Sequence, residues 1–222
     1  MIQVATLRFL KELKKNNNRE WFEKNRAKFE DARTDFDQFA GEIIGRLGKV
    51  DPTIAHLDAR ASTFRQNRDV RFSKDKSPYK VNMGMYLSKG GRKGVQAGYY
   101  FHLEPGKSMV AGGLWMPLPQ ELKKVRQEID YNWEEFEKLL GNKKFRGSCG
   151  DLDMGVEYKL ARPPKGYDAS NPAIEYLKLK SVLASRPIAD EQITKPEFAK
   201  EIAAHMAILK PLIDFLNRAV EG

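Results

Sequence analysis

Two stretches in the middle of the chain alternate between apolar and polar residues, and this pattern constrains the fold more than any other. Residues 81–88 and 96–104 place an apolar side chain at every second position, which is the period of a β-strand with one buried face. Residues 89–94 (KGGRKG) lie between them and have the composition of a hairpin loop. The pattern therefore predicts an antiparallel sheet with one face on the core and the other partly in contact with water.

The segments on either side of these strands show the three- and four-residue spacing of amphipathic helices. Apolar residues at this spacing predict a short helix over residues 7–13 and a long helix over residues 21–47. The long helix is preceded by Asn17 and Glu20, whose spacing resembles a capping box. The same spacing predicts four helices in the second half of the chain, at residues 119–130, 132–141, 171–180 and 195–220.

These patterns define the fold class that we expect. The protein is predicted to be α+β, with an antiparallel sheet of about four to six strands packed against long N- and C-terminal helices. The core strands are expected near residues 62–67, 81–88, 96–104 and 108–116, with an edge strand over 181–188. Residues 141–168 are rich in Gly, Lys and Pro and are predicted to be an irregular connection.

The length of the chain favours one domain. A chain of 222 residues buries about 70–75% of the surface that its unfolded form exposes, so a full core is expected. We predict a single domain over residues 1–222, with a helical N-terminal part (1–58), a sheet part (59–117) and a mainly helical C-terminal part (118–222). The oligomeric state is not indicated by the sequence.

Cysteine content and hydropathy indicate the compartment. The single cysteine, Cys149, excludes an internal disulfide and a paired-cysteine metal site, as expected in a reducing environment. No stretch approaches the roughly 18 apolar residues that a membrane span needs. The first 18 residues form an amphipathic pattern without the apolar run and cleavage site of a signal peptide. We therefore expect a cytoplasmic protein with no membrane contact.

Positive charge is concentrated in one part of the chain. The protein has a net charge of +9, and residues 60–93 alone contain ten Lys and Arg against two Asp. The densest stretch, residues 65–80 (RQNRDVRFSKDKSPYK), predicts a site for an anionic or phosphorylated small molecule. The arginines provide forked donors, the lysines add charge and the aspartates orient the arginines. The predicted binding residues are Arg65, Arg68, Asp69, Arg71, Lys74, Asp75, Lys76, Tyr79 and Lys80.

Two other interpretations of this segment stay open. It is also compatible with a nucleic-acid-binding module that uses the same segment and the loop at 89–94. Alternatively, the protein is a non-enzymatic structural or assembly protein, and the cations pair with carboxylates of a partner subunit or of their own chain. The acidic residues considered for such an internal network are Glu30, Asp31, Asp35 and Asp37.

Candidates for catalysis are few, and whether the protein is an enzyme stays open. His102 lies on the predicted wet face of a strand, beside Tyr100 and Glu104, and histidine is the residue used most often as a general base. Tyr79 is the second candidate, because we expect its hydroxyl to lie near the cationic groups of the segment. The three histidines and the single cysteine show no metal-ligand spacing, so no metal site is predicted. No cofactor is indicated.

Several motifs resemble one known family. The main one is Arg65-x-x-Arg68-Asp69-x-Arg71-Phe72-Ser73-x-Asp75-Lys76-x-x-Tyr79. Other matching motifs are Asn17-x-Arg19-x-Trp21-Phe22, Tyr99-Tyr100-x-His102-Leu103-Glu104-Pro105-Gly106, Gly112-Gly113-Leu114-Trp115-Met116-Pro117, Pro164-Lys165-Gly166-Tyr167 and Asn171-Pro172-Ala173-Ile174. Across nearly the whole chain, the sequence resembles the uncharacterised, mainly bacterial family "domain of unknown function 2461". The resemblance implies no activity or ligand.

Overall fold

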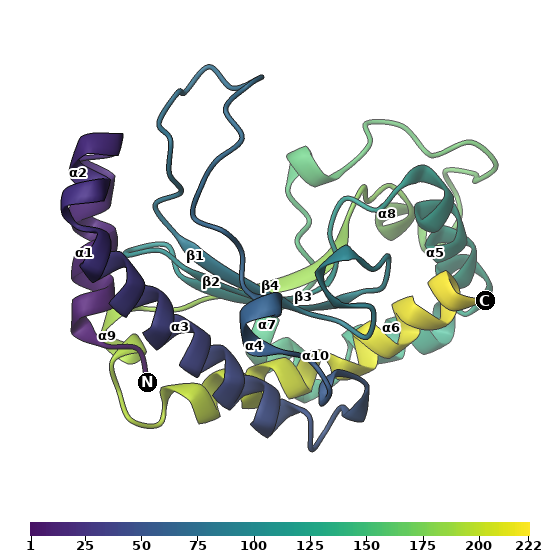
Figure 1. Cartoon of the computed structure of the whole chain (residues 1–222). Coiled ribbons are helices and arrows are strands. Elements are labelled where there is room, and N and C mark those ends of the chain that lie inside the picture. The colour runs from purple at the N-terminus through teal and green to yellow at the C-terminus, as the bar shows by residue number, and fades with distance from the viewer. The chain divides into compact units, whose positions relative to one another are not determined.

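The computed structural model describes residues 1–222 and has an α+β fold. Its four strands are β1 (Met83–Leu87), β2 (Gly98–Leu103), β3 (Met109–Leu114) and β4 (Val182–Pro187). They form one antiparallel sheet in the order β1-β2-β3-β4, and N- and C-terminal helices pack on it (Figure 1). The predicted fold class and the predicted strands at 81–88, 96–104, 108–116 and 181–188 are confirmed.

The strand expected over residues 62–67 is wrong. The segment makes one isolated bridge with β1, between Thr63 and Met85, and a second bridge between Asn67 and Tyr79. The chain thus leaves the sheet after Phe64, whose N–H donates to the Gly84 carbonyl at 2.9 Å. It then pairs with the returning arm of its own loop, so it cannot continue as a sheet strand.

Helices make up most of the remaining structure. Those of the first half are α1 (Val4–Lys15), α2 (Arg19–Lys24), α3 (Arg26–Leu47), α4 (Ala59–Ser62) and the 3₁₀ helices η1 (Pro52–Ile54) and η2 (Gly91–Lys93). Those of the second half are α5 (Pro119–Tyr131), α6 (Trp133–Leu140), α7 (Lys143–Cys149), η3 (Val156–Tyr158), α8 (Ile174–Leu177), α9 (Asp190–Ile193) and α10 (Phe198–Glu221). None of them combines the length and the apolar character that a membrane crossing requires.

Four helix predictions need correction. The helix predicted over residues 171–180 is only four residues long, α8 (Ile174–Leu177). The long helix predicted over residues 21–47 is interrupted at Asn25, whose side chain donates to the Trp21 carbonyl at 2.9 Å and so caps the end of α2. The N-cap of α2 is Asn18, which accepts from the Trp21 N–H, and not Asn17. Helix α7 lies in the stretch predicted to be irregular, and it begins where Asn142 caps its first N–H groups.

The contacts divide the chain into two compact units, each assembled from segments that are distant in sequence. Unit 1 contains Met1–Leu87, Tyr100–Val110 and Pro187–Ala204. Unit 2 contains Ser88–Tyr99, Ala111–Arg186 and His205–Gly222. The single domain of residues 1–222 stays a prediction.

The core of unit 1 is aromatic. Phe39 of α3 contacts Phe101 of β2 and Phe198 of α10, with ring centroids 5.2 and 5.4 Å apart. Phe101 and Leu103 of β2 are fully buried, whereas His102 between them is partly exposed. Because successive strand residues point to opposite faces, the other face of β2 is left for polar groups.

The core of unit 2 forms around α10. Phe215 of α10 contacts Phe136 of α6, with ring centroids 5.0 Å apart. A side chain at Gly112 of β3 would come within 2.9 Å of Leu209 of α10, so this glycine permits the close approach of helix and strand. Helix α10 continues through the interior Pro211.

Candidate functional site

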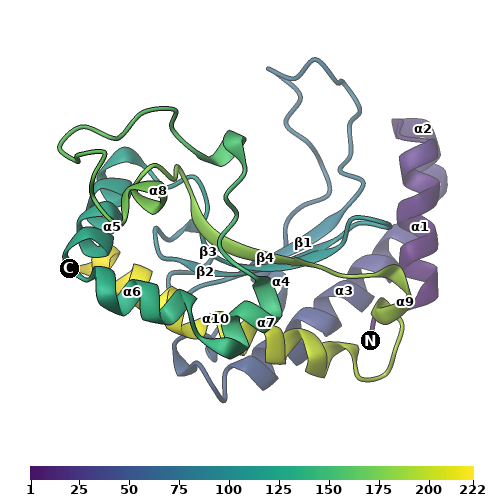
Figure 2. The same ribbon diagram turned by 180° about the vertical axis from the view of Figure 1, so that it is seen from behind.

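The cationic segment forms a loop that extends away from the sheet. We call residues 65–80 the cationic loop; it is the long blue loop at the top of Figure 1, and it is seen from behind in Figure 2. Two backbone hydrogen bonds close its base, from the Lys80 N–H to the Gln66 carbonyl at 2.8 Å and from the Arg68 N–H to the Pro78 carbonyl at 2.9 Å. The buried Gln66 side chain also donates to the Lys80 carbonyl. Hydrogen bonds between the two arms of the loop therefore fix the conformation of its base.

The base of the loop is also held by the segment between α1 and α2. The Asn17 amide donates to the Tyr79 carbonyl at 2.9 Å and accepts from the Tyr79 N–H at 3.1 Å. The Tyr79 ring is buried and stacks on Phe22, with ring centroids 3.8 Å apart. The structure thus brings together the motif at residues 17–22 and the motif at 65–79. Tyr79 anchors the loop and does not present its ring to a ligand.

Two arginines of the loop pair with aspartates of the same loop. Arg68 donates to Asp75 at 2.5 Å and to the Ser77 carbonyl at 3.1 Å. Arg71 makes a two-pronged pair with Asp69, at 3.0 and 2.7 Å. These pairs use aspartates of the loop itself and not Glu30, Asp31, Asp35 or Asp37, the residues considered for an internal network with α3.

The loop keeps a positive charge after this pairing. Its six Lys and Arg outnumber its two Asp, which leaves a net charge of +4. Arg65 and Lys74 are exposed and form no hydrogen bond or ion pair through their side chains, whereas Lys76 donates to the Val70 carbonyl at 3.0 Å. Phe72 is 96% exposed. Positive charge is thus presented to solvent beside an exposed aromatic ring.

Hydrogen bonds keep both loop aspartates ionised. Ser77 and Arg68 donate to Asp75 and lower the pKa of its carboxyl to about 2. Arg71 donates to Asp69 and lowers the pKa of that carboxyl below its ordinary value. The two aspartates therefore balance only two of the six positive charges of the loop.

A second polar group lies on the wet face of β2. The Tyr100 hydroxyl lies 2.9 Å from Nδ1 of His102, and Nε2 of the same ring lies 3.2 Å from Oε2 of Glu104. The predicted set of Tyr100, His102 and Glu104 is therefore brought together. In the neutral tautomer whose Nε2–H donates to the Glu104 carboxylate, Nδ1 is the nitrogen that accepts from the Tyr100 hydroxyl. Lys14 contacts the other oxygen of Glu104 at 3.4 Å, and the Asn82 amide lies 3.4 Å from Nδ1.

The foot of the cationic loop touches this polar group, and both belong to unit 1. Gln66 donates to the Asn82 carbonyl at 3.3 Å. The Phe64 ring packs edge-on against Tyr100, with centroids 6.3 Å apart, and the Lys80 ammonium lies 5.3 Å from the centroid of Phe64. The sequence analysis missed Phe64, Gln66 and Asn82 as members of this group, although the alternation in 81–88 already placed Asn82 on the polar face of its strand.

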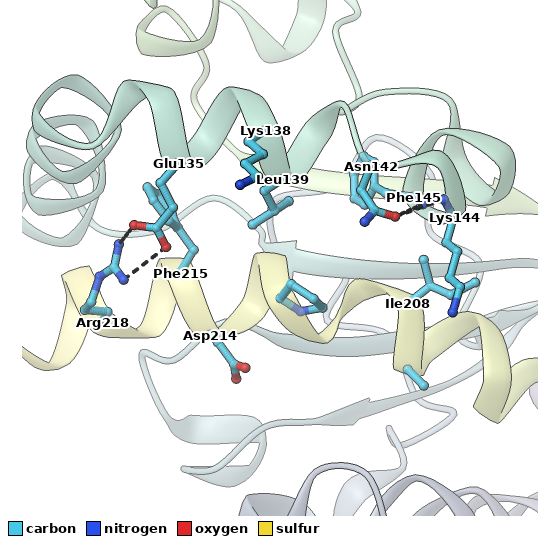
Figure 3. A pocket seen from close by; sticks show the side chains of 12 residues that line it. Glu135, Lys138, Leu139, Asn142, Lys144, Phe145, Ile208, Asp214, Phe215 and Arg218 are labelled. Carbon is cyan, nitrogen blue, oxygen red and sulfur yellow. Dashed lines mark hydrogen bonds and ion pairs between the residues drawn. The ribbon is translucent and has the colours of Figure 1, made fainter.

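Unit 2 has a separate groove of about 850 Å³ between α6, α7 and α10 (Figure 3). Glu135 of α6 and Arg218 of α10 form an ion pair at one end, with a shortest distance of 2.7 Å. The pair lowers the pKa of Glu135 and raises that of Arg218. No group of three or more His, Cys, Asp and Glu side chains in the chain is arranged to hold a metal ion.

Fold and site together define an α+β protein in which a projecting cationic loop lies beside a tyrosine–histidine–glutamate set. The chain matches the family model described as "Conserved hypothetical protein (DUF2461)" over residues 5–215, and it belongs to this family. The predicted resemblance is thereby confirmed. No curated protein and no solved structure matches the chain.

Proposed function

We propose that the protein binds an anionic, phosphorylated ligand through the cationic loop. The observation that supports this most directly is the positive charge that remains in the loop after its two arginine–aspartate pairs have formed. Arg65 and Lys74 are exposed and form no ion pair, and the loop as a whole has a net charge of +4. Groups of this kind attract phosphate oxygens and donate charge-assisted hydrogen bonds to them.

The paired arginines contribute to the same proposal. The Arg71 side chain is 77% exposed and its partner Asp69 is 46% exposed. An ion pair in contact with water contributes little free energy, so a phosphate can approach the guanidinium while the aspartate keeps it oriented. Arg68 is more enclosed, at 26% exposure, and it acts mainly in holding the two arms of the loop together.

The test is a binding measurement with a matched control. We expect isothermal titration calorimetry to detect binding of inorganic pyrophosphate, and the double variant Arg65→Met/Lys74→Met to weaken it at least about tenfold. The control is Lys15→Met/Lys49→Met, which removes the same charge from two exposed lysines of unit 1 outside the loop. The proposal fails if the unaltered protein does not bind pyrophosphate, or if both double variants bind it equally.

One observation favours a nucleic acid as a second candidate ligand. Phe72 stands exposed at the far end of the cationic loop, with the Arg71 guanidinium 5.8 Å from its ring centroid. Stacking of a base on an aromatic ring contributes about 1–3 kcal/mol. A single strand neutralised by four cations loses affinity with a log–log salt slope of about −3. Fluorescence anisotropy with an oligothymidine should then show this slope, together with weaker binding by Phe72→Ala; a flat salt response excludes this candidate.

We also propose that the protein is cytoplasmic. The chain contains one cysteine, Cys149, and burial raises the pKa of its thiol, so the reactive thiolate is disfavoured. Such cysteine usage is typical of proteins in a reducing compartment. Cell fractionation would test the location directly, and recovery of the protein in a secreted or membrane fraction would contradict it.

A further inference from the structure

The polar group on β2 has the connectivity of a carboxylate–imidazole–hydroxyl set. Tyr100 and His102 are two residues apart on one strand, so their side chains share a face. The hydroxyl lies 2.9 Å from Nδ1, and Nε2 lies 3.2 Å from the Glu104 carboxylate. In the tautomer with the proton on Nε2, the hydroxyl is hydrogen-bonded to the unprotonated nitrogen of a ring whose other nitrogen donates to a carboxylate. This is the relation between nucleophile, base and orienting acid in hydroxyl nucleophile sites.

The acid end of the set is held in place. Lys14 contacts Oε1 of Glu104 at 3.4 Å, which leaves Oε2 for the imidazole. The backbone of Glu104 is tied to Ser108, whose hydroxyl accepts from the Glu104 N–H at 3.1 Å and donates to its carbonyl at 2.9 Å. The side chains of His102 and Glu104 are only 19% and 13% exposed, so water screens their contact weakly.

The Tyr100 hydroxyl occupies space that is free only because residue 84 is a glycine. A Cβ atom on Gly84 would lie 2.9 Å from the Tyr100 hydroxyl oxygen, and the Phe64 ring packs against the other part of the tyrosine. Burial raises the pKa of the Tyr100 hydroxyl, so the phenol stays protonated at neutral pH. It reacts as a nucleophile only if a base removes its proton, and the base in contact is His102.

We infer that Tyr100 is the nucleophile of a phosphoryl-transfer site, with His102 as its base and Glu104 as the residue that positions His102. The substrate class, a phosphate ester held by the cationic loop, rests on the proposed function. The Tyr100 oxygen bonds to phosphorus, and the bond from phosphorus to the leaving oxygen breaks with its electron pair on that oxygen. Nδ1 of His102 takes the phenolic proton and returns it to the leaving alcohol. Water then hydrolyses the phosphotyrosine and restores the phenol.

The reactivity of Tyr100 is tested without a substrate. Benzenesulfonyl fluoride converts a nucleophilic tyrosine into a sulfonate ester with loss of fluoride, and peptide mass spectrometry locates the ester. Among the eight tyrosines, Tyr131 is 75% exposed and serves as the internal reference. We expect Tyr100 to react faster than Tyr131. His102→Ala should slow the Tyr100 reaction about 10–100-fold without affecting Tyr131, and added imidazole should restore part of the rate.

The outcomes separate this inference from the proposed function. If Tyr100 reacts no faster than Tyr131, or reacts equally in His102→Ala, the nucleophile assignment is overturned even if pyrophosphate binds. If the reaction depends on His102 but pyrophosphate neither binds nor protects Tyr100, the ligand proposal fails and the activated hydroxyl stands. Incubation with p-nitrophenyl phosphate should release p-nitrophenol, and Tyr100→Phe should lose this release. No release by the unaltered protein, or equal release by the two proteins, overturns the phosphoryl chemistry.

Discussion

The contact between Asn17 and Tyr79 yields the sharpest stability prediction. Asn17→Ala removes two hydrogen bonds, at 2.9 and 3.1 Å, that fix the backbone of Tyr79 at the base of the cationic loop. Each such bond contributes about 1 kcal/mol net, and more when its partner is left without water. The expected loss is therefore about 2–3 kcal/mol. For a protein of this size, 2 kcal/mol corresponds to a fall of about 4–8 °C in Tm.

The assay is urea unfolding followed by circular dichroism, with thermal scans for Tm. The control is Asn16→Ala, which removes one exposed hydrogen bond, from the Asn16 amide to the Glu12 carbonyl at 3.0 Å. It should cost less than about 1 kcal/mol. Hydrogen exchange adds a local measurement, because the Lys80 amide at the loop base should exchange faster in Asn17→Ala. Equal losses in the two variants, or an unchanged Lys80 amide, would refute the role of Asn17 as the anchor of the loop.

Three further predictions concern the same region. Tyr79→Ala should lower the free energy of unfolding by about 3–5 kcal/mol in urea titrations, because it empties a buried ring site, whereas Tyr79→Phe keeps the stack and should change it little. Gly84→Ala should cost about 1–3 kcal/mol through its clash with the Tyr100 hydroxyl, and the double variant Gly84→Ala/Tyr100→Phe should recover part of that loss. The pKa of Asp75 in the folded protein is lowered to about 2. The ionised Asp75 therefore stabilises the loop above pH 4, and this stabilisation is lost as the pH falls toward 2. An NMR titration of Asp75 should give a midpoint near this pKa, and the midpoint should rise in Ser77→Ala.

Much of the fold was predictable because it rests on local periodicity. The alternation over residues 81–88 and 96–104 predicted β1 and β2 to within two residues at each end. It also predicted their polar and buried faces, since a period of two fixes the face of each side chain. The strand expected at 62–67 failed for a non-local reason, because these residues pair partly with β1 and partly with residues 78–80.

The tyrosine–histidine–glutamate set was predictable from the sequence, whereas the ion pairs of the cationic loop were not. Tyr100, His102 and Glu104 lie at every second residue, so their meeting on one face followed from the strand pattern. The ion pairs of the cationic loop did not follow, because Asp69 and Asp75 compete with many other carboxylates of the chain for the two arginines. Spacing along the sequence does not decide such a competition.

The sequence by itself determined where charge is concentrated and which strand residues share a face, because both properties depend on residues that are near one another in the chain. Only the tertiary structure decided that Tyr79 is buried against Phe22 and that Lys14 reaches Glu104. These contacts join residues about 57 and 90 positions apart, and their formation depends on how helices and sheet pack. Packing depends on the shape of the whole core, which no local pattern encodes.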